Sequence, residues 1–403
     1  MLTIVLVLLV MIGGFNGYYD PYEIYHFPDN DLAAIEKPEL ESHLRLHKAY
    51  VVKKVKPDSI LIGTSRVLVG MDPHNSALPA GRWYNLALTG ASIYEILRYI
   101  QHANAVRPLK TIVLDVEYGS FDPYLHHKPD FDETRLAVDR QGNTNPVFLK
   151  DYLRTLFSYD ALKDSLALAT GPGDLLQPIL GDGSRENDFR SVVRAGGHRK
   201  LVDGISKRLL KIYHQRQLHP IDIRQKRADL YLAYEQILRL AHRDRINLVM
   251  FVPPTHAVYL EIRKMAGLWQ DFKTWREKIV EINNRVAREM NRPPFPIWDF
   301  SGFNEYTEEE VPVEGELREM NWYWESSHFK RKLGDIIFRR MFAQHSASAG
   351  FSGGFGTLLD LNTVPLTNRK LDEEERNYSL SHRDEIRHLR KILGHINQSD
   401  TAL

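Results

Sequence analysis

The sequence of 403 residues contains no cysteine. This absence excludes disulfide bonds, catalysis by a thiolate and metal sites with cysteine ligands. The net charge is only +1, so the chain lacks the excess of basic residues that attracts nucleic acid, and we expect no nucleic-acid partner. It also has no Walker loop, no Gly-x-Gly-x-x-Gly and no His-Glu-x-x-His motif. We therefore expect neither a cofactor nor a bound metal ion.

Basic residues are missing from the N-terminal segment, where the first Lys or Arg is Lys37. Residues 2–15, "LTIVLVLLVMIGGF", are almost wholly apolar. A signal peptide normally has a basic start and a small-x-small cleavage site, and neither is present. The run is also shorter than the roughly 20 residues of a full membrane span. We interpret residues 1–19 as an uncleaved membrane anchor, or signal-like segment, whose start lies upstream. A buried N-terminal strand or helix is the alternative.

The remaining chain has the composition of a globular protein, with 43 % apolar and 26 % charged residues. Short apolar segments typical of buried strands lie at 59–63, 82–88, 110–118, 247–254 and 295–300. Apolar residues recur at helical spacing within 43–54, 92–106, 226–245, 255–291 and 326–342. This alternation predicts an α/β fold with a parallel sheet of about five strands and helices on both faces. Reactive side chains of such sheets gather at the carboxyl ends of the strands.

Two segments depart from the alternation. Residues 121–224 are polar and rich in Gly and Pro, and we interpret them as a mostly helical insertion, with helix at 147–169. The insertion is either a lid or substrate platform or a plain surface excursion. Residues 345–356 are a small-residue linker, followed by a charged tail that we expect to form an amphipathic helix on the domain edge. The main domain is thus expected over 20–344.

A serine follows the first predicted strand, in the sequence "LIGTSR" (61–66). Gly-x-Ser occurs four times in the chain, but only Gly63-Thr64-Ser65 ends a short apolar strand near the start of the βαβ pattern. Ser65 is therefore expected at the mouth of the sheet, where backbone N–H groups of the following turn can stabilise an oxyanion. The alternative is a turn serine that caps the next segment.

A serine nucleophile needs a base, and the base needs an acid that orients it. Glu325 precedes His328 by three residues, on a predicted loop between an aromatic run and the last helix of the main domain. The same spacing occurs at Glu23-His26 and Glu385-His388, but without this context. We therefore select Glu325 and His328 as the acid and the base. A surface Glu-His pair ahead of a helix is the alternative.

Together these features resemble the SGNH/GDSL hydrolase superfamily, and more closely its envelope-polysaccharide branch. That branch includes membrane-anchored alginate acetylation proteins and the D-alanyl transfer protein of teichoic acid synthesis. The resemblance is carried by "MLTIVLVLLVMIGG", "YYDPYEIY", "IGTSR", "NLALTGAS" and the acid-x-x-His before the last helix. It covers residues 1–342 without the insertion, and it implies a flavodoxin-like sheet.

The resemblance implies a role for each matching residue. Ser65 matches the nucleophile, His328 matches the base, and Glu325 holds a position usually occupied by aspartate. The N–H groups of Ser65 and Gly90 match two oxyanion donors. The family's third block supplies an asparagine donor, but here the strand ends "LDVEYGSFD". The carboxylates of Asp115 and Glu117 would repel an oxyanion unless protonated.

This departure leaves a two-donor oxyanion hole, completed by Arg66, or a weak or lost activity. Three residues are candidates for substrate binding. Arg66 is expected either to bind a glycan carboxylate or to form a salt bridge with Asp115 or Asp299. Asp115 ends the third predicted strand. His256 follows the fourth, where it either lines the cleft or is a satisfied capping or core residue.

The resemblance implies a serine-dependent O-acyltransferase or esterase that acts on a cell-envelope or secreted polysaccharide. It also implies a membrane-anchored protein facing the periplasm or cell exterior, with a membrane-bound acyl donor protein as a partner. The alternative is a non-catalytic glycan-binding or assembly component that retains the fold. A distance of about 3 Å between Ser65 Oγ and a His328 ring nitrogen favours the enzyme, and more than about 8 Å favours the binding component.

Overall fold

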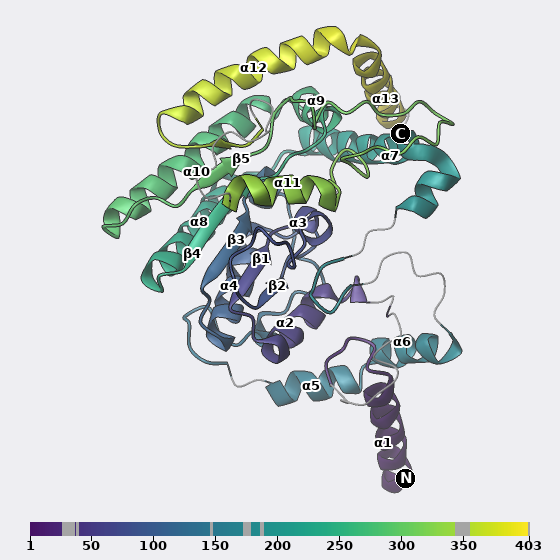
Figure 1. The fold of residues 1–403 in the computed structure, drawn as a ribbon. Helices are drawn as coiled ribbons and strands as arrows, with labels where there is room; N and C mark the ends of the chain where they lie inside the picture. Colours follow the sequence, from purple (N-terminus) through teal and green to yellow (C-terminus); the bar gives the residue numbers. More distant parts are fainter. Residues whose placement is uncertain are drawn as a thin grey trace.

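A six-stranded sheet forms the centre of the computed structural model, which describes residues 1–25, 37, 40–145, 148–171, 179–185, 189–342 and 355–401 (Figure 1). The strands are β1 (Ser59–Ile62), β2 (Trp83–Asn85), β3 (Thr111–Asp115), β4 (Asn247–Val252), β5 (Ile297–Asp299) and β6 (Thr357–Leu358). β1 to β5 lie within the five predicted segments and pair in parallel. The predicted α/β class is confirmed. The sheet is mixed rather than wholly parallel, because β6 pairs antiparallel with β5.

The strand order is β2-β1-β3-β4-β5-β6. The first five strands thus follow one of the two common orders of doubly wound α/β sheets. In this order the chain moves from β1 outward to β2 and then returns to place β3 on the other side of β1. The crevice outside the carboxyl ends of β1 and β3 is where such sheets bind ligands. A ligand site is therefore expected in the segments after these two strands.

Helices cover both faces of the sheet, and every residue of β1 and β3 is buried. Four helices contact one another in sequence: α2 (Leu44–Val55), α4 (Ile93–Val106), α8 (Arg224–Arg243) and α10 (Trp269–Glu289). Other helices of the main domain are α3 (Ser65–Gly70), α9 (Ala257–Met265) and α11 (Arg331–Phe342), and α3 contacts α11. α4 begins with a capping box, in which Ser92 and Glu95 each bond the other's backbone N–H.

The N-terminal segment is a single helix, α1 (Leu2–Tyr19). It projects from one end of the molecule, with the N-terminus at its tip (Figure 1). Its mean hydropathy is 1.9, and it is long and apolar enough to cross a membrane or to be a signal sequence. The C-terminal end of α1 is bonded to the insertion, because Asn16 Nδ2 donates to the Leu156 carbonyl at 2.7 Å.

The insertion divides into two parts. α5 (Phe148–Leu156) and α6 (Tyr159–Thr170) pack against α1, at the end of the molecule where α1 projects (Figure 1). α7 (Arg190–Leu218), which changes direction at Gly197, packs instead against α9 and the C-terminal tail. One part of the insertion thus packs against the N-terminal helix, and the other packs against the main domain and the C-terminal tail.

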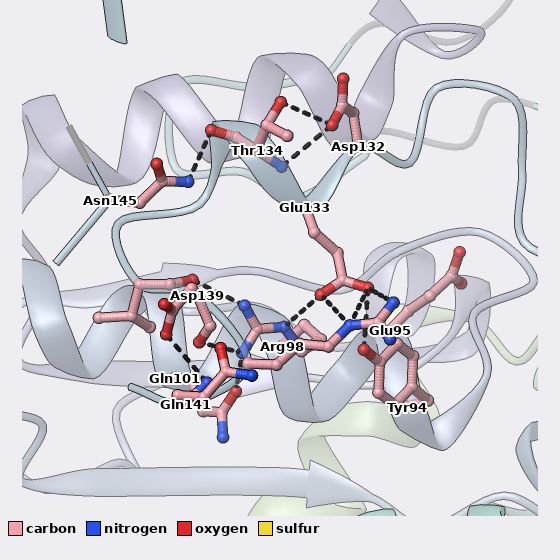
Figure 2. A network of polar contacts seen from close by, with 12 residues as sticks. Tyr94, Glu95, Arg98, Gln101, Asp132, Glu133, Thr134, Asp139, Gln141 and Asn145 are labelled. Carbon is pink, nitrogen blue, oxygen red and sulfur yellow. Dashed lines mark hydrogen bonds and ion pairs between the residues drawn. The ribbon is translucent and has the colours of Figure 1, made fainter. Parts of the chain in front are cut away.

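The beginning of the insertion is fastened to α4 by a polar network (Figure 2). Arg98 Nε lies 3.1 Å from Glu133, and the Tyr94 hydroxyl donates to the same carboxylate at 2.8 Å. The Arg98 guanidinium also donates to the carbonyls of Val138 and Asp139, at 2.6 and 3.0 Å. These contacts hold the segment after β3 against the helix that follows β2.

The C-terminal tail contains two helices, α12 (Thr363–Ser381) and α13 (Arg383–Thr401), where the sequence indicated one. α12 packs on α10, and α13 packs on α7 and α9. Arg276 of α10 is buried and contacts Asp299 of β5 and Asn368 of α12. The tail therefore packs on the main domain through strand β6 and through helices α12 and α13. Most of the predicted linker, residues 345–354, lies outside the described residues.

Candidate active site

The turn after β1 brings Ser65 to the carboxyl edge of the sheet. At Gly63 an added Cβ would lie 2.3 Å from the Asp115 Cβ, so only glycine lets the ends of β1 and β3 approach this closely. Thr64 is the N-cap of α3, and its hydroxyl accepts from the Arg66 N–H at 3.4 Å. Ser65 is therefore not the capping residue. It is the first residue of α3, and it is half-buried.

The loop that carries His328 is stabilised by its own hydrogen bonds. The Trp324 N–H donates to the His328 carbonyl at 2.9 Å. The Glu325 carboxylate accepts from the N–H groups of Ser327 and His328, at 2.6 and 3.1 Å. Glu325 thus folds the loop around itself, which places its carboxylate and the His328 ring on the same side.

Close helix packing brings this loop to the β1 turn. α11 follows the loop, and an added Cβ on Gly334 would lie 1.9 Å from the Gly70 carbonyl oxygen of α3. On Gly70 an added Cβ would lie 2.2 Å from the Phe329 ring. Gly334 therefore allows α11 to contact the α3 backbone directly, and Gly70 leaves room for the Phe329 ring at the end of the loop.

The result is a continuous Ser-His-Glu arrangement. His328 Nε2 lies 2.8 Å from Ser65 Oγ, across 263 positions of sequence, and His328 Nδ1 contacts Glu325 Oε1. Because the carboxylate accepts the proton on Nδ1, Nε2 is left to accept from the serine hydroxyl. Glu325 is 2 % exposed and the His328 side chain 19 %, so the acid is buried and the base is open to a ligand.

The environment keeps Glu325 ionised. Burial by itself raises the pKa of Glu325. The opposing effects of the His328 ring, the Ser327 N–H and Arg66 are larger, and the pKa lies below its ordinary value. The carboxylate is therefore negative at neutral pH, as an acid that orients a histidine must be.

Arg66 connects the two segments of the site and is 2 % exposed. Its Nε donates to the Ser327 carbonyl at 2.9 Å, and its Nη2 donates to Ser327 Oγ at 3.2 Å. It also forms an ion pair with Glu117, and its guanidinium lies 5.2 Å from the centroid of the Tyr259 ring. The salt-bridge partner is thus Glu117, rather than the Asp115 or Asp299 considered from the sequence. In this structure Arg66 holds the histidine loop.

Asp115 lies under the Ser65 turn. Its Oδ2 accepts from the N–H and the hydroxyl of Thr64, at 3.3 and 3.0 Å, and its Oδ1 is buried without a partner among the described residues. Burial raises the pKa of Asp115 to about 6. The same hydroxyl lies 2.6 Å from Glu117 Oε2. The single proton of the Thr64 hydroxyl can be donated to only one of these two carboxylates at a time.

The two predicted oxyanion donors follow β1 and β2: Ser65 is the first residue of α3, and Gly90 lies in the turn before α4. No hydrogen bond from the N–H of Ser65 or Gly90 occurs within the described part of the chain. Gly90 is exposed, and its φ of +58° lies in the left-handed region that favours glycine.

His256 lies outside this arrangement. It is buried, and its ring accepts from the Val258 N–H at 3.2 Å, which caps α9. Its other nitrogen contacts the Glu309 carbonyl at 2.5 Å. Both ring nitrogens are therefore used inside the protein. Of the two alternatives predicted from the sequence, His256 is therefore the capping residue whose ring is satisfied, and it is not a cleft residue.

The insertion contributes two residues that the sequence did not single out. His198 of α7 contacts the Trp324 carbonyl at 2.9 Å and accepts from the Met320 N–H at 3.1 Å, which supports the His328 loop from behind. The centroid of the Phe189 ring lies 6.5 Å from that of His328. No local pattern marks either residue, because their neighbours come from more than 120 positions away.

Comparisons with protein-family models, with curated proteins and with solved structures found no match for this chain. Within the described residues, no group of three or more His, Asp or Glu could hold a metal ion. The fold and the geometry of Ser65, His328 and Glu325 are therefore the observations that bear on function.

Proposed function

We propose that this protein is an SGNH-like serine-dependent O-acyltransferase or esterase that acts on a cell-envelope or secreted polysaccharide. The observation that carries the proposal is the 2.8 Å contact between Ser65 Oγ and His328 Nε2, with Glu325 behind the ring. A serine, a histidine and a buried acid in this order are the components of acyl transfer through a covalent serine ester. The flavodoxin-like order of the first five strands is also that of the proposed fold.

The proposed reaction has two halves. Ser65 Oγ attacks the carbonyl carbon of an acyl donor, and its proton moves to His328 Nε2. The N–H groups of Ser65 and Gly90 stabilise the tetrahedral oxyanion. The intermediate collapses, His328 returns the proton to the leaving group, and Ser65 keeps the acyl group. A sugar hydroxyl or water then gives its proton to His328 and attacks the acyl-serine. The second tetrahedral intermediate collapses, and His328 returns this proton to Ser65 Oγ as the acyl group leaves with the acceptor.

Membrane attachment through α1 is part of the proposal. Residues 2–11 of α1 are exposed to solvent, and none of their side chains carries a charge. An exposed apolar helix of this kind is stable only when lipid or another apolar surface covers it. A membrane-anchored enzyme facing the periplasm or cell exterior, served by a membrane-bound acyl donor protein, fits this arrangement.

The segment after β3 gives the alternative function its support. It carries Asp115 and Glu117 where the resembled family has an asparagine donor, and both carboxylates are engaged by Thr64. A protein that binds or assembles glycans without catalysis could keep the same fold. Removing one oxyanion donor typically costs about 100- to 1000-fold in rate, so a two-donor site is expected to be slow.

The proposal is tested with a fluorophosphonate probe and with an aryl acetate. We expect wild-type protein to be labelled and to turn over the ester, and Ser65→Ala to do neither. Ser206→Ala is the matched control, because Ser206 also follows a Gly-x pair but its hydroxyl bonds the Val202 carbonyl within α7. Equal labelling of wild type and Ser65→Ala would remove Ser65 from the mechanism and leave the binding component.

A further inference from the structure

A cavity lies near the Ser65 turn. It has a volume of about 230 Å³ and is enclosed by the segment after β3 and by residues of α7, α8, α9 and α10. Tyr259 of α9 lines this cavity and also carries the Arg66 guanidinium over its ring. The cavity is smaller than the roughly 300–1,000 Å³ of pockets for drug-sized ligands, so it suits a single ring rather than a polymer.

The cavity is also lined by a buried arginine that has no anionic partner among the described residues. Arg263 is 4 % exposed, and its guanidinium lies 4.2 Å from the Phe272 ring centroid, 5.0 Å from that of Tyr118 and 5.6 Å from that of Tyr259. No carboxylate within the described ranges pairs with it. Its Nε is buried with no hydrogen-bond partner there. The positive charge is therefore surrounded by aromatic faces.

The two other arginines of the cavity differ from Arg263. Arg216 pairs with Asp122 at 2.6 Å, and Arg227 pairs with Asp271 at 3.1 Å. These two carboxylates also line the cavity. They neutralise Arg216 and Arg227, which are the more exposed arginines, but they do not pair with Arg263.

Burying a cation without an anion costs free energy, and aromatic faces offset only a part of that cost. A bound anion would remove the remaining cost. The guanidinium presents a planar fork of N–H donors that fits a carboxylate or a phosphate with two parallel hydrogen bonds. The tyrosine side chains around it offer flat faces to a ring and hydroxyl groups to its polar substituents.

We propose that this cavity binds an organic anion, namely one ring that carries a carboxylate or a phosphate, with the anionic group on Arg263. The ring lies between the aromatic side chains of α7, α8 and α9. Binding does not require chemistry at Ser65, so the proposal stands apart from the hydrolase function. The shared Tyr259 ring places the ligand next to the turn that carries Ser65.

The test is titration calorimetry on the full-length protein in detergent. The probes are methyl glucuronide and glucose 6-phosphate as ring anions, methyl glucoside as the neutral ring, and acetate and inorganic phosphate as free anions. We expect at least one ring anion to bind at least tenfold more tightly than methyl glucoside and than its free anion. The affinity should be the same in wild type and in Ser65→Ala, which separates this result from the test of catalysis.

Arg263→Met should weaken binding of that ring anion at least tenfold, whereas Arg243→Met, on an exposed ion pair with Asp244, should not change it. A purely structural role predicts that Arg263→Met lowers the melting temperature. The proposal predicts an unchanged or higher value, because the variant removes an unpaired buried charge. Equal affinity for neutral and anionic rings, no binding of any probe, or unchanged binding in Arg263→Met would overturn the proposal.

Discussion

The guanidinium of Arg66 donates to both the carbonyl and the hydroxyl of Ser327, a residue 261 positions later in the sequence. Arg66 directly follows Ser65, and Ser327 directly precedes His328. One arginine therefore joins the two segments whose side chains must meet at hydrogen-bond distance. It is a positioning residue, since its own donors are engaged with Ser327 and Glu117 rather than with the reacting atoms.

We expect Arg66→Lys to lower kcat about 10- to 100-fold. A lysine ammonium lacks the planar fork of donors with which Arg66 binds Ser327 and Glu117 at the same time. The His328 loop would shift, and a displacement of about 1 Å in a catalytic group lowers the rate by up to about 100-fold. Arg66→Met should in addition lower the free energy of unfolding by about 3–5 kcal/mol, since Glu117 is left without its cation. Ester turnover and urea unfolding provide the two measurements. A wild-type kcat in Arg66→Lys would show that the loop positions itself.

Glu325 sets which ring nitrogen of His328 carries the proton. Glu325→Gln presents an amide in place of the acceptor and favours the wrong tautomer, so we expect kcat to fall about 10³- to 10⁴-fold. Glu325→Asp keeps the charge on a shorter side chain and should retain more activity than Glu325→Gln. Ester turnover by the two variants decides this. If both lose activity equally, the length of the side chain matters more than its charge.

Asp115 should make stability depend on pH in a defined direction. Its pKa is about 6 in the folded chain and 3.8 ordinarily, so the folded state binds more protons between these values. Stability therefore falls as the pH rises from about 4 to above 6. Because one pKa unit corresponds to about 1.4 kcal/mol, the full effect is about 3 kcal/mol.

Asp115→Asn mimics the protonated side chain and removes this dependence. We expect its stability relative to wild type to increase between pH 4 and pH 7, as measured by urea unfolding at unit steps of pH. All other titratable groups are common to the two proteins, so the difference isolates Asp115. A constant difference across this range would mean that Asp115 titrates at its ordinary value.

Neighbouring glycines in α1 offer a matched test of its contact with the insertion. An added Cβ on Gly13 would lie 2.7 Å from the Phe157 ring, whereas one on Gly14 would meet no atom of the described residues within 4 Å. Gly13→Val should therefore loosen α5 and α6 and speed their amide hydrogen exchange about tenfold or more. Gly14→Val should leave this exchange unchanged. Equal effects in both variants would show that helix propensity, rather than the contact, holds α1.

Local patterns were sufficient to predict several parts of this protein. The segments of β1, β3 and β4 are continuous apolar runs, which a strand covered on both faces requires. Ser65 and His328 were found because each stands directly beside a recognisable element boundary. A strand end and a helix start are properties of short stretches, so the sequence alone indicates them.

Other features depend on contacts that no short stretch encodes. β6 has only two residues, and both are exposed, so its strand character comes only from pairing with β5. The partner of Arg66 could not be selected from the sequence, because Asp115, Glu117 and Asp299 are all acids at strand ends. The division of the insertion depends on the surfaces that α1 and α9 offer to it.

The order of apolar and polar residues along the chain by itself determined the α/β class, the apolar N-terminal helix and the identity of the candidate nucleophile and base. Only the tertiary structure decided that Arg66 supports the histidine loop, that His256 caps a helix, and that Arg263 is buried without an acidic partner in the described part of the chain. The reason is physical: periodicity and capping act within a few residues, whereas charge pairing and burial depend on which distant segments the folded chain brings into contact.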